Sequence, residues 1–154
     1  MKKYIGCKLV EAQPMNRGDY NRYRGWSIPE NEYPYDDGYL VKYPDDYISW
    51  SPKGVFEKAY LAVDDNNDLP SGVSIGPDMV DNFVAYTETK TMGDCTTVVR
   101  CVLRNGFVIV ESSSCVDPKN YSEDMGYEIC MNKIRDKIWE LLGFLLQTAW
   151  RGIE

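Results

Sequence analysis

The sequence predicts an α+β protein of two small modules, each an antiparallel sheet packed by a helix, with a long C-terminal helix. Three observations support this fold class. A polar segment without hydrophobic periodicity lies at 63–78, an Asn-Gly pair interrupts a β-branched run at 96–113, and a leucine-rich stripe with helical spacing covers 122–150.

The polar segment, VDDNNDLPSGVSIGPD, divides the chain because Asp, Asn, Gly, Pro and Ser favour turns over regular structure. We therefore expect an N-terminal β-rich module at 1–62, a linker at 63–78 and a C-terminal module at 79–154.

The first module begins with a predicted strand at 4–12, where apolar and polar residues alternate. The polar segment 16–26 fits either a short helix or a loop, and 29–38 fits a loop. The next stretch, GYLVKYPDDYISWSPKGVFEKAY at 38–60, is dense in aromatic residues. It predicts a hairpin and then a short helix.

In that hairpin, a two-residue turn at Asp45-Asp46 would place Val41 opposite Trp50 on one face. Ser51 is a good helix cap, and Pro52 fits the first helical position. The apolar residues of the short helix, Val55, Phe56 and Ala59, are expected to point inward.

The second module has the strongest local signal in the chain. A two-residue turn at Asn105-Gly106 would place Arg100 opposite Glu111 as a cross-strand ion pair. The opposite face would then hold Val99, Cys101, Leu103, Val108 and Val110. The preceding segment, 79–91, fits either a short helix or a strand.

The long helix is predicted at 122–150, capped by Ser122. Acidic residues at 123 and 124 suit the positive end of its dipole. The apolar surface near its end is wider than one sheet requires, which indicates contact with the first module or a homo-oligomer interface.

Composition excludes several functions. The 154 residues include no His, which removes the commonest general base and metal ligand. Five Cys without a C-x-x-C pair predict reduced, buried thiols and no zinc, with Cys95 and Cys115 as the pair nearest to bridging. Residues 64–154 carry the whole net charge of −7. The sequence contains no basic stripe, which argues against nucleic-acid binding. No run is long enough for a membrane span, so we expect a cytoplasmic protein.

A candidate ligand site lies in the aromatic segments of the first module. Aromatic rings can stack on a nucleobase, arginine can bind a phosphate, and hydroxyl groups can bind a sugar or phosphate. The alternative is that these residues form ordinary core and surface. The expected ligand-binding residues are Arg24, Trp26, Tyr39, Tyr43, Ser49, Trp50 and Ser51. Neither a catalytic site nor a cofactor site is expected.

Residues 95–147 resemble a family of small tailed-phage accessory proteins. The features that carry the resemblance are Asn105-Gly106-Phe107, the turn Cys115-Val116-Asp117-Pro118, and Ile138-Trp139-x-Leu141 with Gly143 and Leu145. This resemblance implies a phage or prophage origin and no defined biochemical role.

The first module resembles a second group of small phage proteins, through K-x-x-x-A-x-P-M at 8–15 and the segment 38–60. The segment is also similar to the end of the Thoeris anti-defence sponge family, through Trp50-x-Pro52 and the aromatic Tyr60. Arg24-Gly25-Trp26 matches an early Arg and Trp of that family. The resemblance implies capture of a cyclic nucleotide-derived immune signal.

The sequence therefore favours a phage anti-defence protein of the host cytoplasm that sequesters a nucleotide-like molecule without catalysis. The alternative is an inhibitor of a bacterial defence protein, such as a CRISPR nuclease, that acts through the acidic second module. A structural or regulatory phage protein without either activity is a third interpretation.

Overall fold

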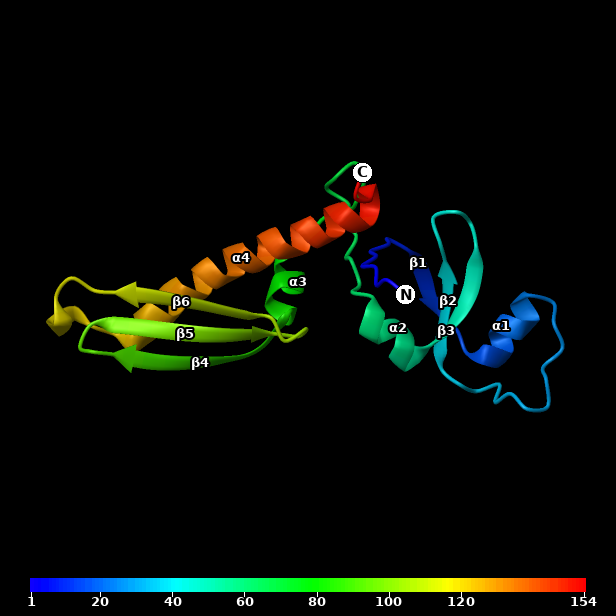
Figure 1. Ribbon diagram of the computed structural model, residues 1–154, viewed down its shortest axis with the longest axis horizontal. Coiled ribbons are helices and arrows are strands. Elements are labelled where there is room, and N and C mark those ends of the chain that lie inside the picture. Colours follow the sequence, from blue (N-terminus) through cyan, green and yellow to red (C-terminus); the bar gives the residue numbers. More distant parts are fainter. The chain divides into compact units, whose positions relative to one another are not determined.

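The computed structural model describes residues 1–154 and contains two compact units, residues 1–62 with 147–154 and residues 63–146 (Figure 1). Each unit contains one three-stranded antiparallel sheet and helices, so the predicted α+β class is confirmed. No helix combines the length and apolar character that a membrane crossing requires.

The first unit has the sheet order β1-β2-β3 (Figure 1). Its elements are β1 (Glu11–Pro14), α1 (Arg17–Tyr23), β2 (Gly38–Lys42), β3 (Ile48–Pro52) and α2 (Lys53–Ala59). The buried side chains of Tyr20, Leu40 and Val41 come from α1 and β2. Leu40 and Val41 are adjacent in the central strand, so their side chains point to opposite faces of the sheet, and both faces of this strand are buried.

Three predictions for this unit are wrong. The first strand covers 11–14 rather than 4–12, because residues 4–10 have no partner strand. Ser51 pairs with Tyr39 in the sheet, so the residue that caps α2 is Pro52, without a side-chain hydrogen bond. Val55 is 62 % exposed, and Phe56 is the residue of α2 that packs inward.

The hairpin between β2 and β3 differs from its predicted register by one residue. Leu40, not Val41, lies opposite Trp50, and Val41 lies opposite Ser49. The reason is a three-residue loop at 44–46, closed by a hydrogen bond from the Tyr43 N–H to the Tyr47 carbonyl (2.9 Å). Asp46 adopts the left-handed φ of +66° that ends such a loop.

The second unit has the sheet order β4-β5-β6 (Figure 1). Its elements are α3 (Pro77–Asn82), β4 (Val84–Met92), β5 (Thr96–Leu103), β6 (Val108–Ser114), the 3-10 helix Pro118–Asn120 and most of α4 (Glu123–Arg151). The segment left open as helix or strand therefore holds both. Thr97, Val99 and Cys101 of β5 and Cys130, Ile134 and Ile138 of α4 are fully buried. The Cys130 thiol lies 3.8 Å from the Thr97 carbonyl, so α4 packs on this face of the sheet.

The second hairpin repeats the register error of the first. Val99 lies opposite Glu111 and Arg100 opposite Val110, because the loop is 104–106 with Gly106 at φ +85°. Arg100 instead bonds to Glu88 on β4 (3.1 Å), and Glu111 bonds to Lys137. Val108 and Val110 are consequently exposed, and Ile109 is buried in their place.

The long helix was predicted at 122–150 and is observed at Glu123–Arg151, so both limits agree to within one residue. The Ser122 hydroxyl accepts a hydrogen bond from the Met125 N–H (3.3 Å), as an N-terminal cap does. Leu142 is 3 % exposed, whereas Leu141 and Leu145 are each 42 % exposed. The buried stripe is thus narrower than the apolar surface of the helix.

Candidate functional site

The candidate site of the first unit is built on α1. The Asn16 side chain caps this helix by accepting a hydrogen bond from the Asp19 N–H (2.8 Å). Arg17, Tyr20 and Asn21 follow at spacings of three and four, which places them on one face. Tyr20 and Asn21 are buried at 7 % and 5 % exposure, so this face is packed inward.

A cavity of about 350 Å³ lies against that face. Its volume is near the lower limit of small-molecule sites. It is lined by α1, the following loop and one residue of β3: Arg17, Tyr20, Asn21, Trp26, Ser27, Pro29, Glu32 and Trp50.

One carboxylate, that of Glu32, organises the polar side of the cavity. A terminal nitrogen of Arg17 donates to Glu32 Oε1 (2.5 Å), and the Asn21 amide donates to Oε2 (2.9 Å). The hydrogen bond from Arg17, followed by that from Asn21, lowers the pKa of Glu32 below its ordinary value. Glu32 therefore stays ionised at neutral pH and accepts hydrogen bonds only.

Arg17 keeps donor capacity that the protein does not use. Its Nε is buried and has no hydrogen-bond partner. Its guanidinium lies over the Trp50 ring at 5.0 Å and forms a salt bridge with Glu32, and Asp36 adds a weaker electrostatic attraction. An unpaired buried donor is uncommon in native proteins and requires an explanation.

Trp50 forms a fixed wall of the cavity. Its indole N–H donates to the Met15 carbonyl (2.8 Å), and Arg17 lies over its ring. Gly38 lies so close that a Cβ there would overlap the indole. Trp50 is therefore held by β2, the chain before α1 and α1 itself, and belongs to the fold as much as to the site.

Trp26 is the accessible ring of the cavity, with 53 % of its surface exposed. The Tyr20 ring meets it edge to face at 6.0 Å, and the Arg24 guanidinium lies 4.8 Å from its centroid. The turn that positions it uses Gly25 at φ +72° and a hydrogen bond from the Trp26 N–H to the Asn21 carbonyl (2.8 Å). A flat ligand can reach this ring without displacing core residues.

Of the expected site residues, the structure brings together Trp26 and Trp50, with Arg24 stacked on Trp26. Tyr39, Tyr43, Ser49 and Ser51 do not line the cavity. Tyr39, Ser49 and Ser51 occupy strand positions that face the opposite side of the sheet from Trp50, and Tyr43 lies just after the end of β2.

On that other side, aromatic rings hold α2 against the sheet. Tyr39 stacks on Phe56 at 4.3 Å, Phe56 stacks on Tyr60 at 4.7 Å, and the Tyr39 hydroxyl donates to Glu57 (2.9 Å). Burial, with a smaller effect of Tyr43, raises the pKa of Tyr60. These contacts favour helix packing as the role of most aromatic residues in 38–60.

Six cavity residues are not among the expected site residues: Arg17, Tyr20, Asn21, Ser27, Pro29 and Glu32. The signal that could have found the first three is Asn16 as a cap, followed by i, i+3 and i+4 spacing. Glu32 gave no signal, since it lies in a loop and reaches α1 only in the folded chain.

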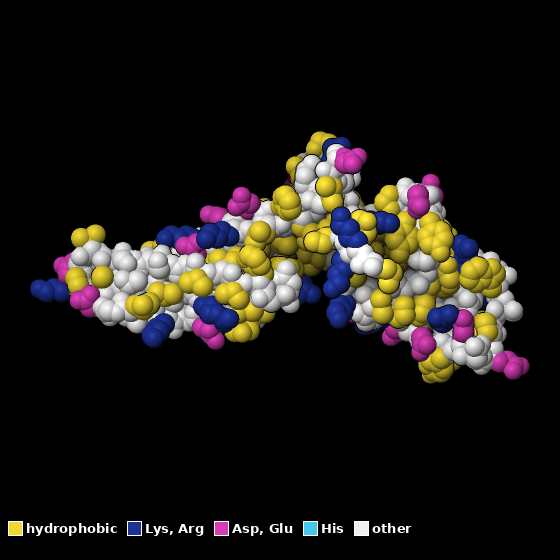
Figure 2. All heavy atoms as spheres, in the orientation of Figure 1, with side chains coloured by type: hydrophobic (Ala, Val, Ile, Leu, Met, Phe, Trp, Pro, Cys, Tyr) yellow, Lys and Arg dark blue, Asp and Glu magenta, His cyan; other side chains and the backbone are white.

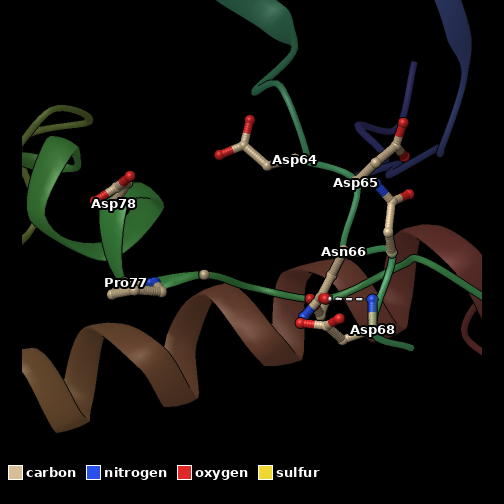
Figure 3. A pocket seen from close by; sticks show the side chains of 9 residues that line it. Asp64, Asp65, Asn66, Asp68, Pro77 and Asp78 are labelled. Atoms are coloured by element: carbon tan, nitrogen blue, oxygen red, sulfur yellow. Dashed lines mark hydrogen bonds between the residues drawn. The ribbon is translucent and has the colours of Figure 1, made fainter.

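A second hollow, of about 480 Å³, lies in the second unit between residues 64 and 78 (Figure 3). Its carboxylates include Asp64, Asp65, Asp68 and Asp78, and Figure 3 shows that they do not converge on one point. Asn66 instead accepts a hydrogen bond from the Asp68 N–H (3.0 Å) within the loop. No group of three or more potential ligands could hold a metal ion.

Residues 75–150 match a family model described as phage protein (N4 Gp49/phage Sf6 gene 66). The match spans just under half of the chain and overlaps the segment 95–147 that resembles phage accessory proteins. A phage-encoded protein fits this match. It does not include the cavity of the first unit, so the likeness to the Thoeris anti-defence family stays a prediction. No curated protein and no solved structure matches the chain.

Proposed function

We propose that this is a phage accessory protein whose first unit sequesters a nucleotide-like immune signal in the host cytoplasm. The observation that carries the proposal is the cavity beside Trp26, where an accessible indole adjoins a fixed polar group. The resemblance of the first module to the Thoeris anti-defence sponge family supports the same ligand class.

Trp26 would supply the stacking surface. Stacking of a base on an aromatic side chain contributes about 1–3 kcal/mol and tolerates any base. Arg24 lies over the same indole and forms no salt bridge, so its charge is available to a phosphate beside the stacked base. Cation and ring together fit a nucleotide better than an uncharged aromatic compound.

The proposed activity is binding without catalysis. The one carboxylate of the cavity is held ionised by Arg17 and Asn21, which makes it a poor general acid. The chain has no His to supply an alternative proton carrier. Ligand release would then return the signal chemically unchanged.

The test is capture from lysates that contain different immune signals, followed by heat release and identification of the released molecules. Wild-type protein is expected to remove one nucleotide signal from the lysate. Trp26→Ala should retain about tenfold less, because one stacking contact is lost. Phe107→Ala is the matched control, since Phe107 is 54 % exposed and lies between β5 and β6, outside the cavity. Equal capture by all three proteins would contradict the proposed site.

The second candidate function, inhibition of a bacterial defence protein such as a nuclease, rests on charge. Residues 64–154 carry the net charge of −7, and four Asp residues surround the hollow of the second unit. A basic protein surface is the partner that such charge favours. Suppression of a nuclease without capture of any nucleotide would support this candidate instead.

A homo-oligomer also stays part of the proposal. Trp139, Leu141 and Leu145 on α4 are each 42 % exposed. On the visible face of the first unit in Figure 2, hydrophobic atoms are interspersed with polar and charged ones and do not form one patch. The exposed α4 side chains are the proposed interface. Light scattering of wild type and Leu145→Glu decides the point, and a monomer at high micromolar concentration would contradict it.

A further inference from the structure

We infer that the cavity of the first unit prefers guanine to adenine, because Arg17 and Glu32 together complement the Watson–Crick edge of guanine. This inference rests on the proposed function and adds the identity of the base. It comes from a hydrogen-bonded Arg–Glu pair that lies beside an accessible indole.

The Watson–Crick edge of guanine carries one acceptor, O6, and two adjacent donors, N1–H and the N2 amino group. A carboxylate can accept from both donors, and a neighbouring guanidinium can donate to O6. Arginine to guanine O6 is a common specific contact in nucleic-acid recognition. Single bases that are stacked on aromatic rings are read along this edge.

Glu32 retains the acceptor capacity that this pairing needs. An ionised carboxylate has about four lone-pair sites, two on each oxygen. Within the protein, Oε1 accepts from Arg17 and Oε2 accepts from Asn21. One site on each oxygen is left, which matches the two adjacent donors of guanine. The side chain of Glu32 is 21 % exposed, so a ligand in the cavity can reach it.

Arg17 retains the donor capacity. Its guanidinium has five N–H groups. One terminal nitrogen bonds to Glu32, and the side chain is 38 % exposed, so the donor for a ligand is a remaining terminal N–H rather than the buried Nε. The Arg17–Glu32 hydrogen bond sets the donor and the acceptors side by side, in the order that guanine presents.

Adenine fits the same pair less well. Its edge carries a single amino donor and the N1 acceptor, so a lone pair would face the Glu32 carboxylate. A site with fixed polar groups discriminates strongly against an analogue that leaves one of them unpaired. Adenine nucleotides should therefore bind at least about tenfold more weakly than guanine nucleotides.

The test is calorimetric titration of the full-length protein with the 5′-monophosphates of guanosine, inosine and adenosine. Inosine lacks only the N2 amino group of guanine. The expected affinity order is guanosine, then inosine, then adenosine. Because this series uses wild-type protein, it does not depend on the folding of any variant.

Variants then assign the preference to Glu32. Glu32→Gln should lose the preference of guanosine over adenosine, since an amide cannot accept on both atoms. Glu30→Gln, two residues away and outside the cavity, should keep it. Trp26→Ala should weaken binding of all three nucleotides by a similar factor.

The outcomes separate the two proposals. Adenosine monophosphate bound as tightly as the guanosine form would overturn the guanine inference and leave nucleotide binding standing. Equal base preference in wild type and Glu32→Gln would also overturn it. If none of the three nucleotides binds at millimolar concentration, both the inference and the nucleotide proposal fail.

Discussion

Replacement of Trp50 by alanine tests the placement of this residue most sharply, because the sequence left its role open between core and ligand site. The structure gives Trp50 three restraints: a hydrogen bond to the Met15 carbonyl, Arg17 over its ring, and close contact with Gly38. Trp50→Ala removes all three. We therefore expect a loss of stability in the first unit before any effect on ligand binding.

The magnitude follows from these contacts. The hydrogen bond contributes about 1 kcal/mol and the cation–π contact about 0.5–1 kcal/mol. Loss of the partly buried ring brings the total to about 3 kcal/mol, the lower end for Trp→Ala in a core. For a domain of this size each kcal/mol shifts the melting temperature by roughly 4–8 °C. The melting transition of the first unit should therefore fall by roughly 12–24 °C.

Scanning calorimetry of full-length protein measures this shift, with Trp26→Ala as the control. Trp26 is 53 % exposed and should cost only about 1 kcal/mol, although its loss weakens ligand capture. A Trp50→Ala transition within roughly 4 °C of wild type would refute the three-contact argument. A larger shift for Trp26→Ala than for Trp50→Ala would reverse the assignment of the two residues.

Three further predictions concern the second unit. Leu142→Ala should lower the free energy of unfolding by about 2–5 kcal/mol in a denaturant titration, because Leu142 is 3 % exposed; a loss below about 1 kcal/mol would contradict its burial. All five Cys are free, and the Cys115 N–H donates to the Cys95 carbonyl (2.9 Å) where β5 begins and β6 ends. Oxidised glutathione should therefore form a single disulfide, between Cys95 and Cys115. Thiol counting should then find three free thiols. A hydrogen bond from Lys137 lowers the pKa of Glu111, so the stability from this pair is present above the unfolded pKa of about 4.3 and is lost as the pH falls through the lower folded value. Lys137→Met should flatten the acid side of the stability–pH profile, and an unchanged profile would exclude this contribution.

Local signals in the sequence were sufficient to predict that most of the helices and strands exist. Three features depend only on residues that are neighbours in the chain: the Asn105-Gly106 turn, the β-branched strands around it and the Ser122 cap. They can therefore be predicted from the sequence. The same holds for the fold class. The predicted position of the first strand was wrong because its partner, β2, begins more than twenty residues later. Pairing with β2, rather than the alternation of apolar and polar residues, decided which residues join the sheet.

The registers of both hairpins depended on the loop conformation. Asp46 and Gly106 adopt left-handed φ angles that close three-residue loops, where two-residue turns were expected. One extra loop residue exchanges the two faces of a strand. That exchange moved Val41 away from Trp50, exposed Val110 and separated Arg100 from Glu111.

The sequence by itself determined that aromatic and arginine residues are concentrated in the first module, and two of the residues expected at a ligand site, Trp26 and Trp50, line one cavity. Only the tertiary structure decided which other residues join them. Strand alternation turned Tyr39 and Ser51 to the opposite face, where Tyr39 packs on α2, and the chain reversal after α1 brought Glu32 to Arg17. A cavity is formed by side chains from distant segments, and their meeting depends on register and chain path, which no local pattern encodes.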